Sequence, residues 1–352
     1  MKAAVLYEKG DFRLGEWEDV APGPGEVKIH VRACGICGSD VPRIWGNEAH
    51  FYPVVLGHEF SGDVVQVGEG VKALTVGDRV AGAPLRPCMK CEDCQNGNFS
   101  LCKHYSFIGS RQQGAFAEYV VIPEENAVKF NDQVSYEMGA LFEPSTVALH
   151  GVRCSKMRGG EDVAILGTGN IGILAMQWAK IMGAKRVIVF DIFNERLELA
   201  KRLGADAVFN TTKEGWLEEA MAYTDGKGYP YVFETAGQPA TIKIGFQLTA
   251  NKGQLTCIGT PHKDVTFGWK EWELMNRKEF FVTGTWMSYS APFPGQEWTL
   301  TAHYFGNGQL KLDESMIFEK VPLSECTRAA AMFEKPGLVK GKVLLMSDID
   351  LG

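Results

Sequence analysis

Residues 163–172 read Val-Ala-Ile-Leu-Gly-Thr-Gly-Asn-Ile-Gly, and this stretch decides the fold of the second half of the chain. Its first four residues form a continuous apolar run, which is typical of a strand buried on both faces. After the glycine-rich turn, apolar residues recur at helical spacing up to residue 182. A second apolar run at 187–190 then ends on Asp191. The order strand, glycine turn, helix, strand and acid predicts a dinucleotide-binding unit.

The glycine turn has a direct chemical use in such a unit. Glycines let the backbone approach a pyrophosphate at the helix N-terminus, where free N–H groups and the helix dipole favour an anion. Asp191 is placed to accept hydrogen bonds from the adenosine ribose and to repel a 2′-phosphate, which favours NAD over NADP. A plain strand–turn–helix that binds no nucleotide is the alternative. The residues expected to bind the cofactor are Gly167, Gly169, Asn170, Ile171, Gly172, Asp191 and Arg196.

Strand and helix patterns keep alternating beyond this unit. Strands are expected at 207–210, 231–234, 254–259 and 280–284, and helices at 194–203 and 239–248. Because crossovers between parallel strands are right-handed, these segments predict one doubly wound parallel sheet.

The remaining segments are strand-rich instead. Residues 1–85 contain short strand-like runs separated by Gly and Pro, and the tail returns to this pattern at 342–346. A chain of 352 residues is long enough for two cores. We therefore expect an α/β protein with two domains. They are a β-rich catalytic domain of residues 1–147 and 286–352, and a Rossmann domain of residues 148–285.

A first candidate metal site lies in the β-rich part. Cys37 stands in a glycine-rich segment, and His58 follows within the sequence Leu-Gly-His-Glu at 56–59. A thiolate and an imidazole are ligands that Zn²⁺ prefers, and a catalytic zinc takes three protein ligands and keeps one position open. We expect Glu143 to be the third ligand, with Glu59 as a further candidate. A buried inert cysteine and a core histidine are the alternative.

A second candidate metal site needs no distant residues. Four cysteines fall within fifteen residues, at positions 88, 91, 94 and 102. Four thiolates at this spacing surround one tetrahedral ion completely and leave no position for a substrate, so the site is structural. A redox-active cysteine cluster is the alternative. The expected ligands are Cys88, Cys91, Cys94 and Cys102.

The bulk composition excludes several classes of partner. A formal net charge of −7 argues against nucleic acid and against an anionic membrane surface. The first residues have no signal-peptide pattern, and no apolar run is long enough to span a bilayer. Nine cysteines, four of them clustered, form a poor disulfide framework. We expect a cytoplasmic protein without membrane or nucleic-acid partners.

The order of these motifs resembles the zinc-containing medium-chain alcohol/polyol dehydrogenase family over nearly the whole chain. The resemblance implies a GroES-like β domain beside the Rossmann domain, two zinc ions per subunit, NAD, and a homodimer or homotetramer. It also implies that Cys37, His58 and Glu143 hold the catalytic zinc, that Glu59 can approach it, and that Ser39 relays the alcohol proton. Several family members have a histidine five residues after the catalytic cysteine; this chain has Pro42 there.

The residues at 37–43, 107–111 and 291–298 are similar to those of family members that oxidise polyol phosphates. The similarity implies a substrate such as galactitol 1-phosphate, oxidised at C5 to a keto-sugar phosphate such as tagatose 6-phosphate. A phosphate needs cations in an acidic protein, and Arg43 and Arg111 are the candidates, unless both are ordinary surface arginines. An unphosphorylated polyol of the sorbitol/iditol type, or threonine, is the alternative substrate. A non-catalytic NAD-binding scaffold is the alternative of a different class.

Overall fold

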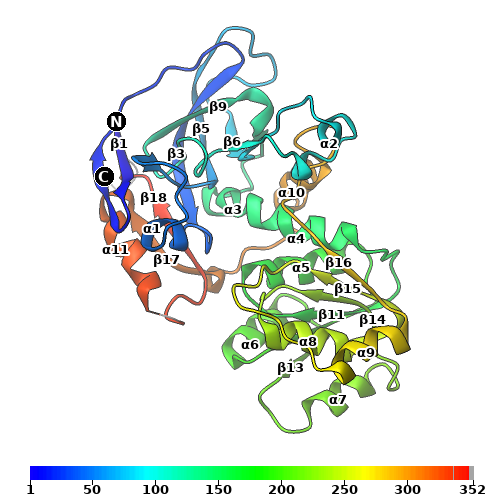
Figure 1. Ribbon diagram of the computed structural model, residues 1–352. Helices are drawn as coiled ribbons and strands as arrows, with labels where there is room; N and C mark the ends of the chain where they lie inside the picture. The colour runs from blue at the N-terminus through cyan, green and yellow to red at the C-terminus, as the bar shows by residue number, and fades with distance from the viewer. Residues whose placement is uncertain (336, 349–352) are drawn as a thin grey trace. The chain divides into compact units, whose positions relative to one another are not determined.

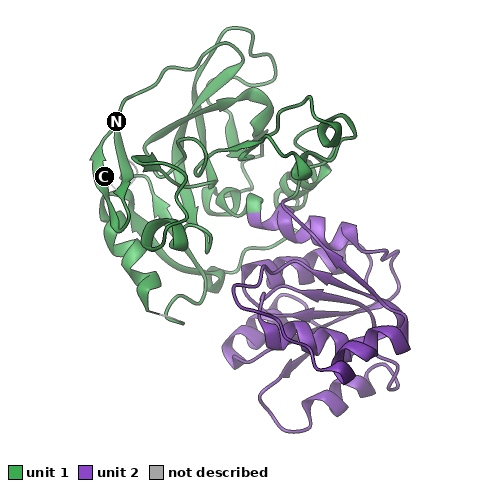
Figure 2. Cartoon of the chain, in the orientation of Figure 1, with its two compact units in different colours: residues 1–143, 288–352 green, residues 144–287 purple. Residues whose placement is uncertain are grey.

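The computed structural model describes residues 1–335 and 337–348. These residues form two compact units, residues 1–143 with the described part of 288–352, and residues 144–287 (Figure 2). The predicted domain boundaries are 147/148 and 285/286. Residues 336 and 349–352, which belong to the predicted range 286–352, lie outside the described residues. The first division falls inside helix α4 (Phe142–Cys154).

Unit 2, which is described throughout residues 144–287, contains a six-stranded parallel sheet (Figure 1). The strand order is β13 (Ala207–Asn210), β12 (Arg186–Asp191), β11 (Asp162–Leu166), β14 (Tyr229–Glu234), β15 (Thr249–Cys257) and β16 (Phe281–Gly284). The reversal of order between the first and the second three strands is that of a doubly wound Rossmann sheet. The predicted fold class of this half is therefore confirmed.

Helices connect these strands, as the alternation predicted. They are α5 (Asn170–Ile181), α6 (Asn194–Arg202), α7 (Trp216–Ala222), α8 (Pro239–Leu248) and α9 (Trp269–Lys278). Helix α5 follows the glycine turn and buries most of its apolar residues, including Trp178. Strand β11 is almost fully buried, which explains its continuous apolar run.

Unit 1 is built from antiparallel sheets and a parallel edge pair. In its described part, the seven-stranded sheet has the path β10-β6-β5-β3-β18-β17, and β9 also pairs with β3. A three-stranded sheet has the order β2-β1-β4, and β7 pairs with β8. The strands are β1 (Lys2–Glu8), β2 (Asp11–Glu16), β3 (Glu26–Ile36), β4 (Val54–Val55), β5 (Glu59–Val67), β6 (Arg79–Gly82), β7 (Leu85–Arg86), β8 (Ser106–Phe107), β9 (Tyr119–Pro123), β10 (Ala127–Lys129), β17 (Ile317–Pro322) and β18 (Lys342–Met346).

Short helices complete unit 1. The α-helices are α1 (Val41–Trp45), α2 (Glu92–Gln95), α3 (Tyr136–Ala140), α10 (Gln296–Gly306) and α11 (Cys326–Ala331). The 3₁₀ turns are η1 (Phe99–Leu101), η2 (Glu124–Asn126), η3 (Glu314–Met316), η4 (Leu323–Glu325) and η5 (Met332–Glu334). Across both described ranges of the chain, we find no helix with the length and apolar content needed to cross a bilayer.

The central strand β3 explains why distant parts of the sequence meet. It pairs with β5 on one side and with β18 from the chain's last part on the other, both antiparallel. Gly35 faces Glu59 in the first pairing and Leu344 in the second. The end of β3, the start of β5 and the start of β18 therefore lie together.

Candidate active site and metal centres

The candidate ligands of the catalytic zinc lie where paired strands end. Cys37 directly follows β3, and His58 directly precedes β5. Ligand atoms of Cys37, His58 and Glu59 lie within 4.8 Å of one another. A sulfur, an imidazole nitrogen and a carboxylate oxygen at this separation fit one tetrahedral Zn²⁺ with Zn–ligand distances of about 2.0–2.3 Å.

Asp40 organises this group from the loop that follows Cys37. Its side chain is fully buried, and it accepts a hydrogen bond from the backbone N–H of Cys37 at 3.0 Å. Its other carboxylate oxygen lies 3.5 Å from Nδ1 of His58. Burial lowers the pKa of His58, but Asp40 and Cys37 more than offset it, so the pKa is raised well above its usual range. A metal that binds His58 would therefore have to displace a proton.

Gly57 lets His58 reach this position. Its φ is +95°, in the left-handed region that favours glycine, and a Cβ there would lie 2.7 Å from the backbone nitrogen of Phe116. The imidazole of His58 in turn packs edge-on against Phe107, with ring centroids 5.6 Å apart. The imidazole of His58 is thus held by packing against Phe107 on one side and by Asp40 on the other.

Lys342 is a member of the site that the sequence analysis missed. Its ammonium donates to Oε1 of Glu59 at 2.8 Å and lies 2.6 Å from Oε2, and both side chains are almost fully buried. Despite burial, the charges of Glu59 and Cys37 raise the pKa of Lys342 above its usual range, so it stays a cation. Lys342 begins β18, and only the pairing of β18 with β3 brings it here.

Glu143 and Ser39 occupy different positions relative to this group. Glu143 lies in the first turn of α4 and is outside the set of three mutually close ligand atoms, but it interacts with the charges of His58 and Glu59. Burial raises the pKa of its carboxyl to about 7. Ser39 is exposed on the loop between Cys37 and Asp40, and its carbonyl accepts a hydrogen bond from Arg43.

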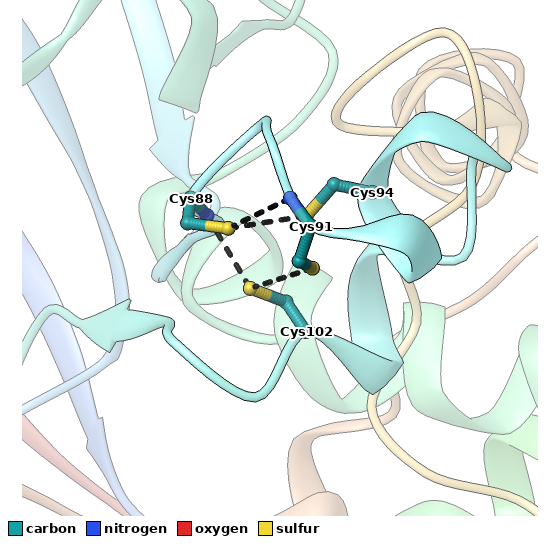
Figure 3. Close-up of side chains that lie close together, drawn as sticks. All are labelled: Cys88, Cys91, Cys94 and Cys102. Carbon is teal, nitrogen blue, oxygen red and sulfur yellow. Dashed lines mark hydrogen bonds between the residues drawn. The ribbon is translucent and has the colours of Figure 1, made fainter.

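The four clustered cysteines converge as a second group (Figure 3). The Sγ atoms of Cys88 and Cys94 are 4.0 Å apart, and those of Cys91 and Cys102 are 3.9 Å apart. Zn–S bonds of about 2.3 Å place the sulfurs of a tetrahedral site about 3.8 Å apart, so the four thiols fit one zinc ion. Backbone N–H groups of Lys90 and Cys91 lower the pKa of Cys88 to about 6, which favours the thiolate that a metal requires.

The cysteine loop is anchored to the segment that follows residue 287. Ser100 accepts a hydrogen bond from the N–H of Tyr289 at 3.0 Å, and Phe99 packs edge-on against Phe293. The hydroxyl of Tyr289 accepts from the N–H of Leu85 at 3.0 Å. The remaining cysteines, 34, 154, 257 and 326, are free and belong to neither metal-capable group of the described residues.

The glycine turn lines a cavity of about 510 Å³ in unit 2. Gly167 has a φ of +92°, and a Cβ on Gly172 would lie 1.9 Å from the carbonyl oxygen of Gly167, so both positions require glycine. Gly169 is the N-cap of α5, has no side-chain cap, and faces open space. Asn170 and Ile171 begin the helix. This open helix N-terminus fits a pyrophosphate.

Asp191 and Arg196 line the same cavity. Asp191 ends β12 and is buried. The guanidinium of Arg196 lies over the ring of Phe193, 5.2 Å from its centroid. Asp191 and Arg196 thus line one cavity at the edge of the sheet where the ribose of a dinucleotide binds in sheets of this kind.

The two arginines proposed for a phosphate differ in their surroundings. Arg43 donates to the Ser39 carbonyl at 2.5 Å and lies 3.7 Å from Asp40, so it also supports the ligand loop. Arg111 is exposed and lies over the ring of Tyr105, 4.6 Å from its centroid. Burial, Arg111 and Arg43 together lower the pKa of His50, so both cations act on the same exposed histidine.

Comparison with known proteins places these sites in a family. Residues 23–132 match the model of the alcohol dehydrogenase GroES-like domain, and residues 170–302 match that of the zinc-binding dehydrogenases. The chain is 39% identical over 349 residues to galactitol 1-phosphate 5-dehydrogenase of Escherichia coli K12, covering 98% of this chain and all of the relative. The chain belongs to the zinc-dependent medium-chain dehydrogenases. The family resemblance and the GroES-like plus Rossmann architecture are therefore confirmed.

Solved structures agree with this assignment of the dehydrogenase. The crystal structure of galactitol-1-phosphate dehydrogenase from Escherichia coli matches with a TM-score of 0.91 at 38% identity, over 98% of this chain and 100% of that one. A zinc-binding dehydrogenase from Sinorhizobium meliloti, solved with NADP, matches at 0.88 and 30% identity over 98% of each chain. Sorbitol dehydrogenase of Bacillus subtilis is 36% identical over 75% of this chain and 76% of its own. Zinc and a nicotinamide dinucleotide are thus the cofactors of this dehydrogenase, as expected.

The cysteine loop gives a first prediction. Substitution Cys91→Ser should remove one zinc equivalent per chain and lower the melting temperature, because metal-binding energy at a closed cysteine site is folding energy. Elemental analysis and thermal melts check both effects. Cys257→Ser, at a partly buried thiol outside both groups, is the control and should keep the full zinc content. An unchanged zinc content in Cys91→Ser would contradict a structural site here.

Lys342 gives a second prediction. Lys342→Met should lower the free energy of unfolding by about 3–5 kcal/mol, since it leaves buried Glu59 without its cation. The loss should be larger after zinc is removed by a chelator, because a divalent ion also compensates these carboxylates. Denaturant unfolding with and without zinc measures the difference. Exposed Lys9→Met is the matched control. An equal loss of unfolding free energy with and without zinc would contradict the inference that Lys342 and a divalent ion both compensate the buried carboxylates.

Proposed function

We propose that this dehydrogenase oxidises a secondary alcohol of a polyol phosphate with NAD as the hydride acceptor. Galactitol 1-phosphate, oxidised at C5 to a keto-sugar phosphate such as tagatose 6-phosphate, is the proposed substrate. The full-length similarity to galactitol 1-phosphate 5-dehydrogenase supports it. The observation that carries the phosphorylated substrate is this similarity, which spans 98% of this chain and all of the relative. Arg43 and Arg111, which both act electrostatically on His50, are the proposed phosphate-binding cations.

Each residue of the catalytic group has a proposed role. Cys37 and His58 would hold the zinc, with Glu143 as the third ligand and Glu59 able to replace it. When bound, zinc supplies Lewis-acid polarisation of the substrate hydroxyl. Asp40 fixes the Cys37 loop and the imidazole of His58 through the contacts described above.

The proton of the alcohol needs a local acceptor. Ser39 is exposed two residues after Cys37 and would accept this proton. Pro42 has no ionisable group, so the proton would continue to water rather than to a side chain at that position. Charge-assisted contacts from the arginines would orient the phosphate end of the substrate.

The cofactor preference rests on Asp191. A buried carboxylate repels the 2′-phosphate of NADP and accepts hydrogen bonds from the free ribose of NAD. Arg196 in the same cavity opposes this preference, but its guanidinium packs on Phe193. We therefore propose NAD, although the Sinorhizobium relative was solved with NADP.

Self-association is the proposed assembly, as a homodimer or homotetramer. Strand β16 ends the sheet among the described residues, and Phe281 and Val282 on it are 51% and 45% exposed. Trp286 beside them is 52% exposed. An apolar sheet edge of this kind favours pairing with another chain.

We further propose a reducing, cytoplasmic setting, since none of the nine cysteines, all of which lie in the described part, forms a disulfide.

Zinc chemistry is tested at Cys37. Cys37→Ala should lower kcat/KM at least about 1000-fold, because Lewis-acid catalysis supplies several kcal/mol and each tenfold in rate is about 1.4 kcal/mol. NADH binding, measured by fluorescence titration, should be retained. The control Cys154→Ser, at a thiol outside both groups that could bind a metal, should keep full activity. Substantial turnover by Cys37→Ala would refute the zinc assignment.

The phosphate is tested at Arg111. Arg111→Ala should raise KM for galactitol 1-phosphate about 10- to 100-fold, since a hydrogen bond to a charged group contributes about 1.5–3 kcal/mol. KM for free galactitol should change less than about twofold on the same reasoning. Arg43→Ala should show the same difference together with weaker zinc retention, because Arg43 supports the ligand loop. Exposed Lys103→Ala is the control. Equal effects on both substrates would favour an unphosphorylated polyol.

A further inference from the structure

The carboxylate of Asp191 is already fully hydrogen-bonded by the protein. Oδ1 accepts from the backbone N–H groups of Ile192 at 2.8 Å and Phe193 at 2.9 Å. Oδ2 accepts from the backbone N–H of Thr168 at 2.7 Å and from its hydroxyl at 2.5 Å. Asp191 is 8% exposed and Thr168 is 3% exposed, and both line the cavity of about 510 Å³.

The number of donors matters because a carboxylate has about four lone-pair directions. Four donors from the described residues occupy them, so a ribose hydroxyl has to displace one to bind Asp191. Three of the four are main-chain N–H groups. The N–H groups of Ile192 and Phe193 belong to the turn between β12 and α6, and that of Thr168 lies between two glycines in the turn after β11.

The hydroxyl of Thr168 is the one donor of this set that rotates away without any movement of the backbone. We propose that this hydroxyl is a stand-in for the cofactor ribose: it satisfies Asp191 in the free enzyme and gives up its place when a ribose hydroxyl arrives. This proposal rests on the proposed binding of NAD at Asp191. It makes Thr168 a positioning and specificity residue for the cofactor.

The exchange selects for a ligand that brings its own donor. A free 2′-hydroxyl replaces the bond that Thr168 gives up, so the carboxylate stays satisfied. A 2′-phosphate brings no such donor at neutral pH and adds negative charge, so the displaced bond is not replaced. The cost of displacing Thr168 is thus recovered by NAD and not by NADP.

Removing the hydroxyl tests the proposal. Thr168→Val keeps the branched side-chain shape but loses the hydroxyl donor. The ribose of NADH then has no side-chain hydroxyl to displace from Asp191. The dissociation constant for NADH should fall about 10- to 100-fold, as expected for one lost competing hydrogen bond to a charged group, which contributes about 1.5–3 kcal/mol. The melting temperature of the cofactor-free protein should fall, and its rise on adding NADH should be larger than in the wild type. Thr168→Ser, which keeps a hydroxyl, should restore the wild-type constant.

Controls separate the possible failures. Thr212→Val removes an exposed hydroxyl that donates to Asn210 and should leave NADH binding unchanged. Titration of the wild type with NADH and NADPH tests the proposed cofactor preference independently. If the wild type prefers NADH and both Thr168→Val and Thr168→Ala bind it equally well or more weakly than the wild type, the stand-in role is refuted while the proposed function stands. If Thr168→Val does not fold, the Thr168→Ala titration decides alone.

Discussion

The burial of several acidic groups in one place is the constraint on which unit 1 depends. The side chains of Cys37, Asp40 and Glu59 lie together where β3, β5 and β18 meet. The carboxyl of Glu143 interacts electrostatically with the charges of Asp40 and Glu59. Placing uncompensated negative charge in a protein interior is expensive. Lys342 and Arg43 supply countercharge from the protein, and a divalent ion bound there would supply the rest. The electrostatics of the site therefore call for a cation, independently of the reaction.

This arrangement depends on strand register. Gly35 faces Glu59 across β3 and β5, and a Cβ at Gly35 would lie 3.1 Å from Cδ of Lys342 and clash with the Glu59 carboxylate. A slip of one residue would turn the neighbouring side chains to the opposite face of the sheet. The glycine thus makes room for a buried ion pair, and the ion pair joins the start of β18 to the start of β5, next to His58.

Much of the fold and part of each site could be predicted because the decisive residues are close in sequence. The glycine turn with Asp191, and the four cysteines at 88–102, are local patterns whose chemistry depends on spacing. Lys342 belongs to no such pattern. It contacts Glu59 across 283 residues through the pairing of strands, and a single lysine in the sequence does not predict that pairing. The sequence also gives no sign that Arg43 supports its own loop through the Ser39 carbonyl, because that contact depends on side-chain conformation. The hydrogen bonds that Asp191 accepts from Thr168, Ile192 and Phe193 could not be predicted for the same reason.

Tyr289 illustrates how unit 1 limits the charge around its catalytic group. Its phenol is buried and accepts a hydrogen bond from the N–H of Leu85, and its backbone N–H donates to the hydroxyl of Ser100 in the cysteine loop. Burial and the negative charge of Glu143 raise its pKa well above the usual range, so it remains neutral. A tyrosine near this carboxylate therefore adds packing and hydrogen bonding without adding another anion. The loop that carries the four cysteines is thereby fixed to a segment that is compatible with a crowded acidic site.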